Sequence, residues 1–160
     1  MSQPWKRRVV SDLRGISDYN GIYATPDPND IRLCDAIIIG PAETIWDRGV
    51  FRLRVTFSDG YPSNPPNVKF LTNIYHPNIY KDGRICLDIL TARSWRASYD
   101  LGSVLMSIRS LLADPNPDDP ANPAAAHEYR YDRHLYEMQV RKCVIDSWVN
   151  PYDVYVPDAQ

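Results

Sequence analysis

The sequence predicts a single α+β domain: a helix, a four-stranded antiparallel meander sheet, a long loop, and then further helices. The chain has 160 residues, which fits one domain able to bury roughly 70% of its unfolded surface. Apolar residues with a helical period occur near both ends, while the strand-like runs are grouped between residues 22 and 71. Strands that are grouped, and do not alternate with helices, favour α+β over a doubly wound fold.

The first helix is expected over residues 4–17, where apolar side chains recur every three or four positions. Gly15 and Asn20-Gly21 end this pattern. The other face of the helix is basic, which is typical of a solvated helix surface. The apolar positions are Trp5, Val9, Leu13 and Ile16. The basic positions are Lys6, Arg7, Arg8 and Arg14.

Strands are expected at residues 22–24, 31–40, 50–57 and 68–71, with a turn from Pro26 to Asp30. The third of them alternates most clearly between apolar and polar side chains, as a strand with one buried face does. Short connections between the runs predict an antiparallel meander. The alternating apolar residues of the third strand are Phe51, Leu53, Val55 and Phe57.

Two irregular segments flank the last strand. Three prolines at 62, 65 and 66 indicate an ordered loop, in which a cis Tyr61–Pro62 bond is possible. Residues 72–98 contain few periodic apolar positions. A loop of that length in a compact domain is uncommon and is often functional.

Helical spacing resumes at residues 101–112, with Asp100 or Ser98 as the expected cap. A proline-stiffened loop follows at 114–120. Asn122-Pro123 is a good helix start, and Asp132 is expected to cap a last helix that reaches Trp148. Residues 1–150 are therefore expected to form one domain, and 151–160 a frayed tail.

Composition excludes several functional classes. The net charge of −2 gives no basic field for nucleic acid, and no apolar stretch approaches the roughly 20 residues of a membrane span. Residues 1–8 lack the apolar core of a signal peptide, so a cytoplasmic or nuclear location is expected. No ligand-spaced cluster indicates a metal, and no glycine-rich loop indicates a nucleotide cofactor.

The three cysteines are far apart in the sequence, which argues against a disulfide framework or a C-x-x-C metal site. Cys34 lies in a strand-like run, and Cys143 falls at helical spacing with Val140 and Val144. Both are interpreted as small buried hydrophobic residues. Cys86 differs because it lies in the long irregular segment.

The run from His76 to Leu90, with the sequence HPNIYKDGRICLDIL, resembles the active-site signature of ubiquitin-conjugating enzymes. Further family landmarks appear in family order over nearly the whole chain. These are Gly40-Pro41, Tyr61-Pro62, Pro65-Pro66, Trp95 and Asp114-Pro115-Asn116-Pro117. Within the family, the basic first helix and Tyr80 are most similar to the DNA-damage-tolerance and histone-modifying branch.

The resemblance implies that Cys86 accepts ubiquitin as a thioester from the activating enzyme and passes it to a substrate lysine. A cysteine suits this role because its thiolate is a strong nucleophile and a thioester is an activated acyl group. No cofactor is implied, because the activating enzyme spends the ATP. His76, with Pro77, is implied to organise the loop backbone; a catalytic base is the minority reading for His76.

Four further residues gain roles from the resemblance. Asn78 is implied to donate an amide hydrogen bond toward the oxyanion, although asparagine also commonly ties down turns. Asp119 is implied to position the acceptor lysine, and Tyr80 to line its path. The simpler alternatives are a solvated loop carboxylate and a packing tyrosine. Asp88 is implied to gate access to Cys86 or to hydrogen-bond locally.

Partner surfaces follow from the same resemblance. Lys6, Arg7 and Arg8 are implied to face acidic groups of the activating enzyme, and ligases to grip the end of this helix and two loops. Ser63 in the first loop argues for RING-type ligases, because partners of thioester-forming ligases often carry phenylalanine there. In the second loop, Arg96 and Ala97 replace the family's usual Ser-Pro after Trp95, which puts ligase choice in question.

A second, noncovalent ubiquitin site on the outer face of the sheet is a further implication, with Tyr23, Arg52 and Arg54 as candidates. The main functional alternative is a conjugating enzyme for another ubiquitin-like modifier, such as SUMO. A noncatalytic family member and a cysteine hydrolase are disfavoured. The former lacks the cysteine, and the latter needs a base poised on Cys86.

Overall fold

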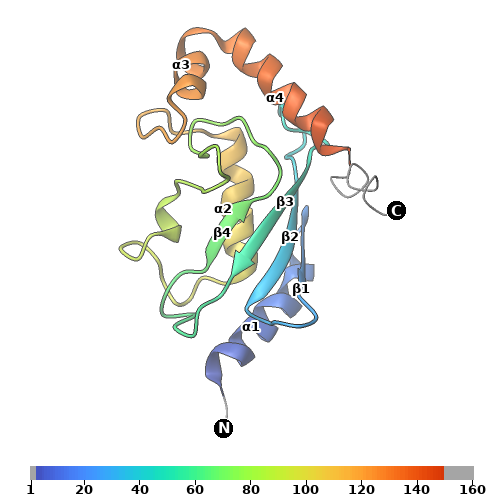
Figure 1. Ribbon diagram of the computed structural model, residues 1–160, viewed down its shortest axis with the longest axis vertical. Helices are drawn as coiled ribbons and strands as arrows, with labels where there is room; N and C mark the ends of the chain where they lie inside the picture. Colours follow the sequence, from blue (N-terminus) through green and yellow to red (C-terminus); the bar gives the residue numbers. More distant parts are fainter. Residues whose placement is uncertain (1–2, 150–160) are drawn as a thin grey trace, which may run out of the picture.

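The computed structural model describes residues 3–149, which form one sheet flanked by helices (Figure 1). The first part of the chain holds α1 (Pro4–Gly15), the 3₁₀ helix η1 (Ile16–Asp18), β1 (Ile22–Pro26), β2 (Leu33–Ile39), β3 (Val50–Thr56) and β4 (Asn67–Phe70). The second part holds the 3₁₀ helix η2 (Asp88–Leu90), α2 (Leu101–Ala113), α3 (Pro123–Tyr131) and α4 (Arg133–Ser147).

The sheet is an antiparallel meander in the order β1-β2-β3-β4. Its register places Ile38 of β2 opposite both Ile22 of β1 and Phe51 of β3. Along β3, buried Phe51, Leu53 and Val55 alternate with more exposed neighbours. The period of two therefore produces one apolar face for the core, as the sequence predicted.

Helix α2 is central to the domain and supplies much of the core. Its fully buried side chains face the sheet, and α1 and the α3–α4 pair lie toward opposite ends of the molecule (Figure 1). The Asp100 carboxylate caps α2 by accepting from the Ser103 amide at 2.7 Å. In return, the Ser103 hydroxyl accepts from the Asp100 amide at 3.0 Å. The buried residues of α2 are Leu101, Gly102, Val104, Leu105, Ile108 and Leu112.

The predicted α+β class, the strand order and the four helices are confirmed within residues 3–149. Asn122 and Asp132 cap α3 and α4, and the Tyr61–Pro62 bond is cis. Cys34 and Cys143 are buried, as expected.

Several boundaries differ from the prediction. The first helix stops at Gly15, and residues 16–18 continue as a 3₁₀ turn. The turn expected from Pro26 to Asp30 is present but begins after Pro26, because β1 includes Pro26 opposite Cys34. Proline is compatible with this position because β1 is an edge strand. Within the turn the Asp27 carboxylate accepts from the Asn29 amide at 2.8 Å. Residues 72–98 are irregular except for η2.

The expected tail at 151–160 lies outside the described residues. No helix within residues 3–149 is long and apolar enough to cross a membrane.

Candidate active site

The segment that carries Cys86 is fastened to the edge of the sheet. Phe70 of β4 donates its amide to the Gly83 carbonyl at 2.9 Å. Gly83 has a φ of +93°, and a Cβ there would lie 2.0 Å from the Phe70 carbonyl oxygen. Only glycine fits this position, so the turn at Gly83 returns the chain toward Cys86.

His76 is fully buried and links the active-site segment to the end of α2. Its Nε2 lies 2.7 Å from the Leu111 carbonyl oxygen, and its Nδ1 accepts from the Asn78 amide at 2.9 Å. This pairing requires the proton on Nε2. Burial lowers the pKa of His76 to about 4, so the ring is neutral and both nitrogens are occupied. The arrangement fits the expected structural role of His76.

Asn78 uses its whole amide group to hold the loop at 114–120. Its Nδ2 donates to the carbonyls of Asn116, at 2.7 Å, and Asp119, at 3.0 Å, while its Oδ1 accepts from the Asn116 amide at 2.8 Å. The neighbouring Pro77 carbonyl accepts from Ala121 and Asn122. In this state Asn78 therefore fixes the backbone beside Cys86, and neither of its amide hydrogens is directed at the sulfur.

Cys86 and Asp119 meet across this scaffold although 33 residues separate them. The Cys86 amide donates to the Asn78 carbonyl at 2.9 Å, and the thiol lies 3.6 Å from Asp119 Oδ2. The thiol is half-buried, whereas the Asp119 side chain is exposed. A partly exposed thiol can accept an acyl group, and a carboxylate beside it can attract an amine to that group.

Local electrostatics keep the free thiol protonated. Burial is the main cause that raises the pKa of Cys86, followed by the charge and hydrogen bond of Asp119 and then the charge of Asp88. Both carboxylates disfavour the thiolate, and both would attract an incoming ammonium. Before Cys86 is acylated, this acidic environment therefore disfavours the thiolate and attracts a cationic amine.

Tyr80 and Asp88 lie on either side of Cys86 in the sequence. Tyr80 is 38% exposed, and the Arg84 guanidinium stacks over its ring at 4.5 Å from the centroid. Asp88 is exposed at the start of η2. Both side chains are accessible from solvent.

The basic first helix is only partly the solvated surface that was expected. Lys6 and Arg7 are exposed, but Arg8 is half-buried and each of its three guanidinium nitrogens donates a hydrogen bond. It donates to Asp12 at 2.8 Å, to the Ala97 carbonyl at 2.8 Å and to the Tyr99 carbonyl at 2.6 Å. Arg8 is thus a clamp between α1 and the loop before α2, which corrects its assignment to the free basic face.

Asp12 is a structural residue that the sequence interpretation missed. It is 4% exposed and accepts bonds from Arg8, from the Tyr61 hydroxyl and, at 3.1 Å, from the Leu101 amide. A signal was present, because Asp12 falls seven residues after Trp5 and three after Val9, on the apolar face. A carboxylate on that face must be paired to be buried.

The two expected ligase loops lie against one another. Ser63, Arg96 and Ala97 are exposed. Beneath them the buried Trp95 donates its indole N–H to the Pro62 carbonyl at 2.7 Å. The structure therefore brings these three residues onto joined loops next to α1.

Other sequence candidates lie apart from Cys86. Tyr23, on the outer face of the sheet, is 59% exposed, and Arg54 pairs with Asp35 at 2.9 Å. Tyr23 and Arg52 line a shallow hollow of about 220 Å³. Among residues 3–149, no group of three or more His, Cys, Asp or Glu side chains could hold a metal ion.

Comparison with known proteins bears on this site. The family model described as ubiquitin-conjugating enzyme matches residues 8–144. Ubiquitin-conjugating enzyme E2 1 of Caenorhabditis elegans is 43% identical over 152 residues, covering 94% of this chain and 79% of that protein. Ubiquitin-conjugating enzyme E2 2 of Candida albicans is 43% identical over 150 residues, covering 92% and 83%. The Debaryomyces hansenii protein of the same name is 45% identical, covering 92% and 89%.

The fold and the cysteine site thus define a transferase. The chain belongs to the ubiquitin-conjugating enzyme family.

Proposed function

We propose that Cys86 carries ubiquitin as a thioester and that the acyl group then passes to a substrate lysine. The observation that supports this most is the 3.6 Å contact between the Cys86 thiol and the Asp119 carboxylate on a scaffold organised by Asn78. Cys34 and Cys143 are buried and lack such a setting. Burial raises the pKa of Cys34 to about 11, which suppresses its thiolate.

In the first step Cys86 loses its proton and attacks the carbonyl of the ubiquitin C-terminus on the activating enzyme. The new carbon–sulfur bond forms at Cys86 as the bond to the activating enzyme's cysteine breaks, so the leaving group is a thiolate. One thioester replaces another, and no further energy source is needed. The exposed Lys6 and Arg7 are proposed to steer the encounter through long-range attraction.

In the second step a lysine amine attacks the thioester carbonyl, and the Cys86 thiolate leaves with formation of an isopeptide bond. An unperturbed lysine has a pKa of about 10.4, so the ammonium must first be held and deprotonated. We assign positioning of the amine to Asp119 and the lining of its path to Tyr80, with Asp88 at the approach to Cys86. Asn78 supports this step by holding the backbone of Asp119. Its oxyanion role requires at least one amide hydrogen to leave a loop carbonyl.

A RING-type ligase is the proposed partner for the surface made by α1 and the Ser63 and Arg96–Ala97 loops. Such a surface suits a ligase that holds the conjugating enzyme without taking the acyl group. Because Arg8 binds the Ala97 and Tyr99 carbonyls, α1 and the second loop are held as one unit. No cofactor is proposed, and a cytoplasmic or nuclear location remains the expectation.

The function is tested by incubating the protein with activating enzyme, ATP and ubiquitin, followed by a nonreducing gel. We expect a reductant-sensitive adduct that Cys86→Ala abolishes and that Cys86→Ser converts into a more durable oxyester. Cys34→Ala is the matched control and should still form the adduct. Parallel reactions with SUMO and its own activating enzyme test the alternative modifier. An adduct that survives in Cys86→Ala would refute the proposal.

A further inference from the structure

Two adjacent aspartates in the loop at 114–120 have different partners. The Asp119 carboxylate lies 3.6 Å from the Cys86 thiol, whereas the Asp118 carboxylate accepts a hydrogen bond from Arg130 of α3. The Asp118 side chain is 80% exposed, so burial does not fix its direction. Its direction therefore depends on the ion pair with Arg130.

Arg130 can position this loop because α3 is itself fastened to the active-site segment. At the start of the helix, the amides of residues 121–122 donate to the Pro77 carbonyl at 2.8 and 2.9 Å. Further along, Glu128 accepts a hydrogen bond of 2.5 Å from the Tyr75 hydroxyl. Pro77 and Tyr75 both belong to the segment that leads to the reactive cysteine. The helix is therefore tied to that segment near both of its ends.

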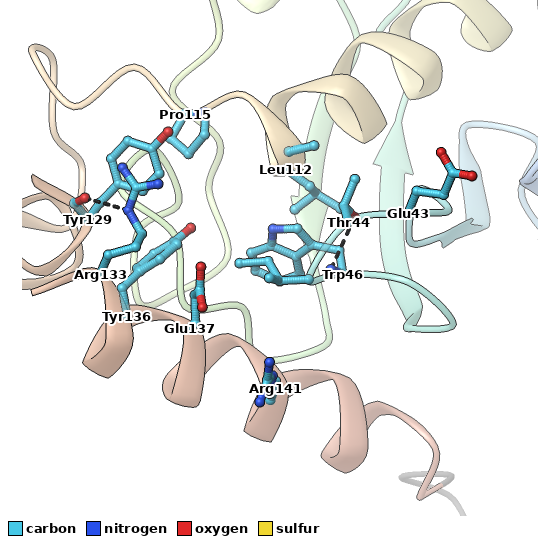
Figure 2. Close-up of a pocket in the computed structure, with 12 residues that line it drawn as sticks. Glu43, Thr44, Trp46, Leu112, Pro115, Tyr129, Arg133, Tyr136, Glu137 and Arg141 are labelled. Atoms are coloured by element: carbon cyan, nitrogen blue, oxygen red, sulfur yellow. Dashed lines mark hydrogen bonds between the residues drawn. The ribbon is translucent and has the colours of Figure 1, made fainter.

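The C-terminal end of α3, which carries Arg130, is also held by α4. The Arg133 guanidinium stacks over the Tyr129 ring at 3.8 Å from the centroid, and its Nε donates to the Tyr129 carbonyl at 2.7 Å (Figure 2). The Tyr129 ring makes an edge contact with the buried Tyr136 ring at 5.2 Å between centroids. Because Tyr129 directly precedes Arg130, these contacts fix the backbone from which the Arg130 side chain extends.

The loop is held on either side of Asp118. Asn78 binds the carbonyl and the amide of Asn116 and the carbonyl of Asp119. The Asp118 amide donates to the Asn116 side chain at 3.2 Å, which is a common bond in turns. A rigid peptide group joins Asp118 to Asp119, with consecutive Cα atoms about 3.8 Å apart. A contact that orients residue 118 therefore restricts the direction of residue 119.

We propose that Arg130 is a positioning residue for lysine transfer, which binds Asp118 and thereby keeps Asp119 directed at Cys86. This inference rests on the function proposed above, in which Asp119 positions the acceptor amine. Without Arg130, two adjacent carboxylates of like charge repel each other, and the exposed Asp119 is able to turn toward water. Because the ion pair is exposed, it contributes little to stability, and its effect is expected in the rate of transfer.

The test uses two substitutions that break the same ion pair but change the charge in opposite directions. Arg130→Ala makes the surroundings of Cys86 more negative, whereas Asp118→Ala makes them less negative. Each variant is charged with ubiquitin, and single-turnover discharge to free lysine is measured at one lysine concentration. We expect both variants to discharge about threefold more slowly, since both lose the contact that orients the loop. A role through charge alone would change the two rates in opposite directions.

A second readout does not depend on ubiquitin. Burial, and then the neighbouring Asp119 and Asp88 carboxylates, raise the pKa of the Cys86 thiol. If Arg130→Ala lets Asp119 turn away, the pH profile of Cys86 alkylation by iodoacetamide should be displaced to lower pH. Loss of a cation without movement of Asp119 would displace the profile to higher pH, because added negative charge disfavours the thiolate.

Three further variants make the test specific. Arg130→Lys keeps the cation and should retain most of the discharge rate. Combining Asp118→Arg with Arg130→Asp rebuilds the ion pair with exchanged partners, so it should recover most of the rate lost in the single variants. Arg141→Ala removes the same charge from an exposed position on α4 and should leave both the rate and the alkylation profile unchanged. Thermal unfolding verifies that each variant is folded.

Several results would overturn this role of Arg130. They are opposite or absent changes of the discharge rate in Arg130→Ala and Asp118→Ala, and no recovery in the charge-exchange variant. An alkylation profile of Arg130→Ala that stays in place or is displaced to higher pH would also contradict it. Failure of the proposed function would look different. The unsubstituted chain would then form no thioester on Cys86, while the alkylation profile would still report the position of Asp119.

Discussion

Buried polar groups are fully hydrogen-bonded in the scaffold around Cys86 but not in the cleft between the end of α2, the loop at 41–48 and α4. In the scaffold, both ring nitrogens of His76 and the whole amide of Asn78 are hydrogen-bonded within the protein. In the cleft, the Tyr136 hydroxyl has no partner among residues 3–149, and Glu137 pairs with neither flanking arginine. A satisfied network rigidifies its surroundings, whereas a buried hydroxyl without a partner costs stability. The first region is organised before substrate arrives, and the second retains a buried polar group without a partner.

The largest effect should come from replacing Asp12, a buried carboxylate that accepts hydrogen bonds from three different residues. Asp12→Ala leaves the Leu101 amide and the Tyr61 hydroxyl without their acceptor and Arg8 without its counter-charge. We expect a loss of about 3 kcal/mol in the free energy of unfolding, measured by urea denaturation. Asp18→Ala, an exposed carboxylate nearby, should change it by less than about 0.5 kcal/mol. Equal effects of the two substitutions would contradict the assignment.

Asn78→Ser shortens the side chain that ties the 114–120 loop to Cys86. Because this loop positions Asp119, we expect lysine transfer to fall by about 100-fold while thioester formation is nearly unchanged. Single-turnover discharge of the charged enzyme to free lysine, beside a separate charging assay, resolves the two steps. If both steps slow equally, Asn78 has no specific role in transfer.

Asp119→Asn separates the two effects of this carboxylate on Cys86. The charge of Asp119 helps to raise the pKa of the thiol, so its removal lowers that pKa and increases the thiolate fraction at a given pH. Alkylation of Cys86 by iodoacetamide should become faster, with its pH profile displaced to lower pH. Lysine discharge should become slower, by about tenfold. A profile that stays in place would show that Asp119 does not influence the thiol.

Arg7 and Arg8 should differ despite being neighbours in the sequence. Arg7→Glu reverses an exposed charge, so charging of Cys86 should slow by about threefold at low ionic strength and recover with added salt. Arg8→Ala breaks the clamp to Ala97 and Tyr99, so its main effect should be a loss of stability that salt does not restore. Identical salt dependence of the two variants would argue that both are free surface charges.

The smallest effect is expected in the cleft. Tyr136→Phe removes a hydroxyl that has no partner, so the free energy of unfolding should stay the same or rise by up to about 1 kcal/mol. The ring contacts with Tyr129 and Tyr75 are retained in this variant. A loss of more than about 1 kcal/mol would indicate that the hydroxyl is satisfied in solution without a ligand.

Periodicity predicted the sheet and the helices because the buried faces of β3 and α2 repeat at 2 and 3.6 residues. Periodicity could not place Pro26 in a strand, because proline is allowed there only at the sheet edge, and the pairing of Pro26 with Cys34 is a tertiary feature. The run around Cys86 indicated the nucleophile, but its contact with Asp119 joins residues 33 apart and depends on the loop that Asn78 holds. Arg8 and Tyr136 show the same limit. Whether a polar side chain is clamped or unpartnered depends on tertiary neighbours that no local pattern encodes.

The most direct test of the central claim is to locate the ubiquitin adduct by mass spectrometry. The charged protein is digested under nonreducing, mildly acidic conditions, and the peptide joined to the ubiquitin C-terminus is sequenced. We expect a thioester on Cys86, with Cys34 and Cys143 unmodified. An adduct on either of those cysteines, or an amide-linked adduct formed without any Cys86 thioester, would contradict it.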